Sequence, residues 1–107
     1  MKAILSCSAL LLGLTLSASA LAHAPFCECK ALDAETIRCV GGFTDGSAAP
    51  GVTLDVMRAA DNQVLLPGKL GADSSLTFKR PAEDFYILFD VGPGYQVEVE
   101  PSEIKGI

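Results

Sequence analysis

Apolar and polar residues alternate along most of the chain after residue 25. Between residues 52 and 58, apolar Val52, Leu54 and Val56 are separated by polar residues. A period of two is the pattern of a strand with one buried face, whereas a helix needs apolar residues three and four positions apart. No segment in this part of the chain sustains the helical period. The alternation predicts seven short strands, at residues 26–30, 36–43, 52–58, 64–69, 76–79, 85–91 and 95–100.

Turn-forming residues separate the predicted strands. Residues 44–47 and 92–94 are rich in Asp, Gly, Ser and Pro, and Asp33 lies in a third candidate turn at 32–35; such residues favour turns through local capping or positive φ angles. Short strands joined by short turns predict an all-β fold, a small antiparallel β-sandwich of immunoglobulin-like shape with about seven strands. We expect the most apolar run, residues 85–91, to be a central strand. In the last strand we expect Tyr95 to face the core.

The first 22 residues have the layout of a secretory signal peptide. Lys2 precedes an apolar stretch over residues 3–16, and small residues lead to Ala20-Leu21-Ala22. Cleavage fits after Ala22 or Ala24, but the second site would leave Pro25 first, so we expect the mature chain to begin at His23. The predicted organisation is a signal peptide at 1–22, a cysteine-bearing strand and turn at 23–35, a β-sandwich core at 36–101 and a flexible tail at 102–107.

Export changes the charge and the redox setting. Removing 22 of the 107 residues leaves 85, enough for one small domain, with 7 basic and 13 acidic residues and a net charge of −6. This balance argues against nucleic acid as a partner. No later segment approaches the ~20 apolar residues of a membrane span, so none is expected after processing. A periplasmic location follows from the leader, and that compartment is oxidising.

Three cysteines remain after the leader is removed: Cys27, Cys29 and Cys39. Alternation places Cys27 and Cys29 on one face of the first strand. If the turn is centred on residue 34, positions whose numbers sum to 68 lie opposite each other, and Cys29 faces Cys39. The sequence therefore predicts a Cys29–Cys39 disulfide and an unpaired Cys27.

The same residues could hold a metal. His23 would offer an α-amine and an imidazole, and Cys27, Cys29 and Cys39 would offer thiolates; sulfur and nitrogen ligands suit copper(I), zinc or nickel. The alternative is a disulfide that staples a small domain, with a spare thiol and a terminal histidine that bind nothing. The sequence leaves both open. It shows no paired nucleophile and base, so we expect no catalytic activity.

A set of turn and core motifs resembles a known family. They are Gly42-Phe43-Thr44-Asp45-Gly46-Ser47, Pro50-Gly51-Val52-Thr53-Leu54, Gly68-Lys69-Leu70-Gly71-Ala72-Asp73, Leu76-Thr77-Phe78, Phe85-Tyr86 and Gly92-Pro93-Gly94-Tyr95. Their order over residues 36–100 is similar to that of the transthyretin-like, carboxypeptidase-regulatory-like β-sandwich, and most similar to small periplasmic domains associated with nickel and cobalt uptake. Those domains commonly carry Gly-His at the last turn, where this chain has Gly94-Tyr95.

Two functions follow from these observations. The resemblance implies a periplasmic accessory protein of transition-metal handling (nickel, cobalt, copper or zinc), which binds the ion or docks on a membrane metal transporter or another periplasmic protein. The alternative, for which the fold alone is sufficient, is a non-catalytic structural or protein-interaction module with a disulfide staple.

Overall fold

The computed structural model describes residues 24–107, and it is built from β-strands. The expected signal peptide at 1–22 and His23 lie outside the described residues. The strands are β1 (Pro25–Ala31), β2 (Thr36–Phe43), β3 (Thr53–Arg58), β4 (Val64–Leu66), β5 (Ser75–Lys79), β6 (Phe85–Gly92) and β7 (Tyr95–Val99). A single 3₁₀ turn, η1 (Pro101–Glu103), follows β7 in this part of the chain.

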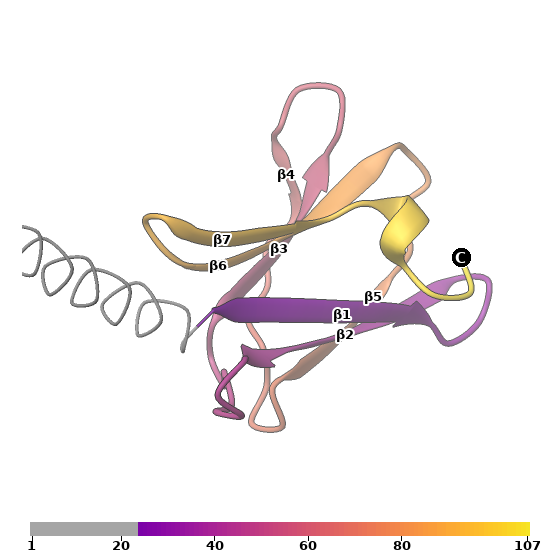
Figure 1. Cartoon of the computed structure of the whole chain (residues 1–107). Coiled ribbons are helices and arrows are strands. Elements are labelled where there is room, and N and C mark those ends of the chain that lie inside the picture. Colours follow the sequence, from indigo (N-terminus) through magenta and orange to yellow (C-terminus); the bar gives the residue numbers. More distant parts are fainter. Residues whose placement is uncertain (1–23) are drawn as a thin grey trace, which may run out of the picture.

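The strands form two antiparallel sheets that pack face to face. One sheet has the order β1-β2-β5 and the other the order β4-β3-β6-β7. In Figure 1 the β6–β7 hairpin lies on one side of β1 and the β2 strand on the other. The all-β sandwich expected from the alternation is confirmed, and the most apolar run is a central strand, since β6 pairs with both β3 and β7. Between residues 24 and 107 no helix has the length and apolarity to cross a membrane.

The core lies between the sheets and comes from the inward positions of the alternating pattern. Leu54 and Val56 of β3 and Ile37 and Cys39 of β2 are each at most 1 % exposed. Ile87 and Phe89 fill the core from β6. Each of these pairs is two residues apart, as the pleat of a strand requires.

The β1–β2 hairpin has the register expected from a turn centred on residue 34. Cys29 pairs with Cys39, and Lys30 pairs with Arg38. In the turn, the Glu35 backbone N–H donates to Asp33 Oδ1 at 2.8 Å, and this bond lowers the pKa of the Asp33 carboxyl. An aspartate that caps its own turn in this way favours the tight reversal over an open loop.

Tyr95 does not face the core, contrary to the expectation from alternation. Its side chain is 59 % exposed. The register of the β6–β7 hairpin shifts between Asp90 and Gly92, and Tyr95 pairs with Gly92 at the tip. Tyr95 keeps the alternation of Val97 and Val99, but at the hairpin tip its side chain is left open to solvent.

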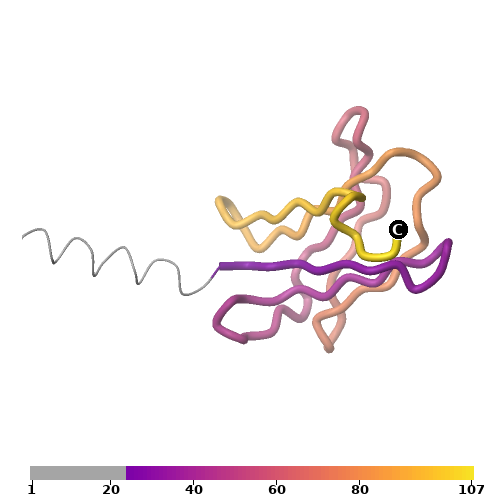
Figure 2. The backbone as a smooth tube through the Cα atoms, turned by 45° about the vertical axis from the view of Figure 1, so that its right-hand side comes forward, coloured from indigo at the N-terminus to yellow at the C-terminus, as the bar shows by residue number. Residues whose placement is uncertain are grey.

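The C-terminal tail was expected to be loosely held, and the structure instead ties it to β1. Ile104 is only 3 % exposed and belongs to the core cluster. The Lys105 N–H donates to the Cys29 carbonyl at 3.1 Å, and the Ala31 N–H donates to the Lys105 carbonyl at 2.8 Å. Figure 2 shows the last residues lying against the end of β1. The tail satisfies backbone groups on the free edge of β1, which the sequence of residues 102–107 alone does not reveal.

Candidate functional site

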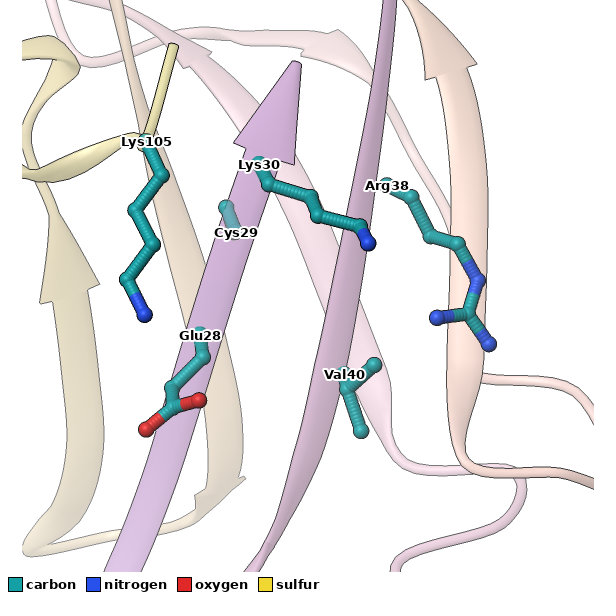
Figure 3. Close-up of a pocket in the computed structure, with 6 residues that line it drawn as sticks. All are labelled: Glu28, Cys29, Lys30, Arg38, Val40 and Lys105. Carbon is teal, nitrogen blue, oxygen red and sulfur yellow. The ribbon is translucent and has the colours of Figure 1, made fainter. Parts of the chain in front are cut away.

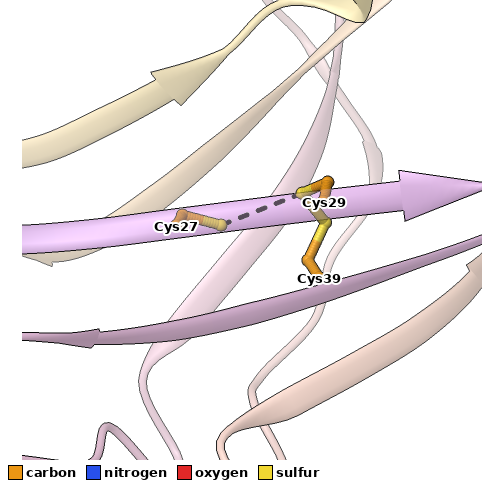
Figure 4. A group of neighbouring side chains, drawn as sticks. All are labelled: Cys27, Cys29 and Cys39. Atoms are coloured by element: carbon orange, nitrogen blue, oxygen red, sulfur yellow. Dashed lines mark hydrogen bonds between the residues drawn. A yellow bond between two sulfur atoms is a disulfide. The ribbon is translucent and has the colours of Figure 1, made fainter. Parts of the chain in front are cut away.

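Three cysteines meet on the inner face of the β1–β2 hairpin. Cys27 and Cys29 are two residues apart on β1, so they project to the same side, and Cys39 lies opposite Cys29 on β2 (Figure 4). Their sulfur atoms all lie within 4.8 Å of one another. They form the one group of three or more His, Cys, Asp or Glu side chains with this spacing between residues 24 and 107.

Cys29 and Cys39 are joined by a disulfide, with Sγ atoms 1.98 Å apart and Cα atoms 4.1 Å apart. The short Cα separation follows from their position directly opposite each other in the hairpin. Cys29 is 4 % exposed and Cys39 is fully buried. The bond therefore lies inside the sandwich, where little of either residue is open to solvent.

Cys27 remains a free thiol at the margin of the core. Its Sγ lies 3.9 Å from Cys29 Sγ, and the side chain is half-buried. Burial, with a smaller contribution from the neighbouring Glu28 carboxylate, raises the pKa of the Cys27 thiol to about 11. At neutral pH the thiol is protonated, and a protonated thiol is neither a good nucleophile nor a good metal ligand.

Cys27 is also badly placed to exchange with the disulfide. Thiol–disulfide exchange needs the attacking sulfur behind the bond that breaks. Here the three sulfurs form a triangle. The Sγ atoms of Cys27 and Cys39 lie within 4.8 Å of each other, whereas a Cys27 sulfur in line behind the disulfide would lie farther from Cys39 than this. Geometry and protonation together keep the Cys29–Cys39 pairing in place.

The cluster can exist in two chemical states with different properties. Oxidised, it is a staple and a spare thiol. Reduced, it presents three thiols, and the 3.9 Å between the sulfurs of Cys27 and Cys29 is close to the ~3.8 Å edge of a tetrahedron with ~2.3 Å zinc–sulfur bonds. The residues therefore fit a soft ion once Cys39 has separated from Cys29, and a fourth ligand would have to come from elsewhere.

Of the predicted site residues, the structure brings together Cys27, Cys29 and Cys39. His23 lies outside the described residues, so its part in the site remains a prediction. Comparison with family models, curated proteins and solved structures finds no match for this chain.

A second feature on the opposite face of the same strands was not anticipated. A hollow of about 280 Å³ there is lined by Glu28, Cys29, Lys30, Arg38, Val40 and Lys105 (Figure 3). The pairing rule that placed Cys29 opposite Cys39 also places Lys30 opposite Arg38, so two of its cations could have been found from sequence. Lys105 could not, because its place depends on how the tail folds back.

Proposed function

We propose that this protein is a periplasmic accessory protein of transition-metal handling that, in its reduced form, binds a soft ion such as copper(I) or zinc through Cys27, Cys29 and Cys39. The observation that carries the proposal is the convergence of three sulfur atoms within 4.8 Å. The resemblance to nickel- and cobalt-uptake domains supports the same function, and it adds a membrane metal transporter as a candidate partner.

The chemistry favours a redox-dependent site. Thiolates of Cys29 and Cys39 become available only when a dithiol reductant has opened the disulfide, with two electrons and two protons taken up. Binding then replaces thiol protons with the ion, so affinity falls as the pH is lowered. His23, four residues before Cys27, is the candidate for a further ligand.

Calorimetry on the reduced and the oxidised protein, with copper(I), zinc, nickel and cobalt, tests this function. We expect binding by the reduced protein alone, lost in Cys27→Ser and in Cys39→Ser. A His23→Ala variant reports whether the histidine contributes. Binding weaker than roughly 1 mM, about −4 kcal/mol, or affinity unchanged in both cysteine variants would contradict the proposal.

A second candidate is favoured by the disulfide itself. A bond buried within the sandwich, beside a thiol with a raised pKa, is what a purely structural staple needs. In that case the protein is a non-catalytic interaction module, and the oxidised and reduced forms bind no ion. The same calorimetry separates the two functions.

Export is the part of the proposal that can be tested most directly. We expect protein recovered from the periplasm to begin at His23. The intact mass reports the first residue, the oxidation state of the cysteines and any retained metal together, and a mass that includes the leader would contradict export.

A further inference from the structure

Three cations lie side by side across the outer face of the β1–β2 hairpin. Lys30 on β1 is in register with Arg38 on β2, and on its other side it bridges to Lys105 of the tail. Neighbouring chain segments in such a ladder are ~4.8 Å apart. The order Lys105–Lys30–Arg38, which we call the cation row, therefore puts like charges directly opposite each other twice, an arrangement that destabilises a sheet.

The cation row has few counter-charges of its own. Lys30 and Lys105 make no ion pair with any residue between 24 and 107, and Arg38 has one exposed pair, with Asp73 at 3.6 Å. This holds although the mature chain would carry 13 acidic residues against 7 basic ones. Glu28, which lines the same hollow, and Asp73, which pairs with Arg38, are the acids placed beside the row, and neither forms a salt bridge with Lys30 or Lys105.

The row surrounds a hollow. Figure 3 shows the Lys30 side chain reaching from β1 across β2, the Arg38 guanidinium beyond it, and Lys105 running along the other side of β1. Val40 contributes an apolar wall to the hollow of about 280 Å³. Glu28 is the single acid that lines it, beside β1 and on the side of Lys105.

We propose that the cation row is a binding site for a small multivalent oxyanion, a phosphate or a di- or tricarboxylate. Two anionic groups on one ligand can engage Lys30 and a neighbouring cation together, and thereby remove the repulsion between them. The planar fork of Arg38 suits bidentate contact with carboxylate or phosphate oxygens. Glu28 disfavours an anion that covers the whole hollow, which restricts the ligand to the cation row itself. This site is separate from the cysteine cluster, because the side chains of the row are on the opposite face of the sheet.

Amide chemical shifts of the oxidised protein, titrated with inorganic phosphate and with citrate at constant ionic strength, test the site. We expect saturable shifts at residues 28–31, 38–40 and 104–106. Lys30→Gln and Lys105→Gln should each weaken binding about tenfold, since a hydrogen bond to a charged group contributes roughly that much. Both variants should fold, because Lys30 is exposed and Lys105 holds the tail through its backbone atoms.

Lys69→Gln is the matched control. Lys69 is an exposed lysine that lies outside the row, where it pairs with Thr53 of the other sheet. The affinity of this variant for citrate should equal that of the wild type. An acidic peptide, tetraglutamate, distinguishes the source of the anion. Equal or weaker binding than citrate supports a free small anion, whereas tighter binding would overturn the proposal and assign the row to acidic side chains of a protein. Shifts that do not saturate, or an equal loss in Lys69→Gln and Lys30→Gln, would overturn the proposal.

Discussion

Cys27 and Gly41 face each other across the β1–β2 hairpin, so the free thiol has bare backbone opposite it. A Cβ atom at Gly41 would lie 2.8 Å from Leu70 Cδ1 and from the Phe89 ring. Glycine is therefore required at this position by close packing between the two sheets, without any unusual φ angle.

We predict that Gly41→Ala destabilises the protein by about 1–3 kcal/mol, because the added methyl group overpacks the contact with Leu70 and Phe89. Chemical denaturation gives the free energy of unfolding. Gly71→Ala is the control, since its nearest neighbours would be an ordinary 3.5 Å away. Equal effects at the two glycines would contradict the packing argument.

The raised pKa of Cys27 predicts how its reactivity depends on pH. Because the folded protein holds the thiol protonated up to about pH 11, alkylation by iodoacetamide should be slow at pH 7 and accelerate about tenfold per pH unit to roughly pH 11. In unfolded protein that keeps its disulfide, the alkylation rate should level off near pH 9.0, the ordinary pKa of a thiol. Burial in the folded form disfavours the Cys27 thiolate. The contribution of the neutral thiol to the free energy of unfolding is therefore present below pH 9 and is lost as the pH rises toward 11. A native alkylation rate that levels off near pH 9 would show that burial does not protect the thiol.

The edge of β1 and the tail form one element, although they come from opposite ends of the described chain. An open edge exposes unpaired N–H and C=O groups that invite association. The backbone of Lys105 pairs with the backbone groups of Cys29 and Ala31, and the buried Ile104 anchors the tail against the core. The tail thus replaces a fourth strand in this sheet.

Substitution in the tail tests the anchor. We predict that Ile104→Ala lowers the free energy of unfolding by about 2–4 kcal/mol, because a fully buried isoleucine leaves a cavity when truncated. Ile107→Ala should change it by less than about 0.5 kcal/mol, since that side chain is 38 % exposed. Both values come from urea denaturation, and a small effect at Ile104 would mean that the tail is dispensable.

Elements defined by local pattern could be predicted from sequence, and elements that depend on distant contacts could not. The bounds of β2 and the pairing of Cys29 with Cys39 follow from alternation and from a turn centred on residue 34. The exposure of Tyr95 depends on what lies opposite the hairpin tip, which the local sequence does not specify. The position of Lys105 beside Lys30 depends on a contact across most of the chain. The cysteine cluster depends on contacts within one hairpin and could be predicted. The cation row depends partly on the same hairpin and partly on the distant tail.

At the scale of the whole molecule, a thin core is reinforced by one covalent link. The disulfide joins neighbouring strands of the smaller sheet and closes a loop with a sequence separation of 10. A loop of this size restricts the unfolded chain moderately, and the buried sulfur atoms also belong to the core.

We predict that reduction lowers the free energy of unfolding by about 2–3 kcal/mol. Urea denaturation with and without a dithiol reductant measures the difference. The double variant Cys29→Ala with Cys39→Ala should not respond to the reductant, whereas Cys27→Ser should respond as the wild type does. Equal stability of reduced and oxidised wild type would mean that the link contributes nothing.

The closure of the β1 edge by the tail has a consequence for the order of folding. Lys105 comes long after β1 in the sequence, so the sheet that begins at Pro25 stays open at one edge until residues 104 and 105 have been synthesised and have folded back. Contacts of such long sequence separation form late, after the hairpins that need only short loops. A chain halted before residue 104 would hold an unfinished edge, ready to recruit a strand from a neighbour. Weakening the tail should therefore hasten unfolding while leaving the folding rate nearly unchanged.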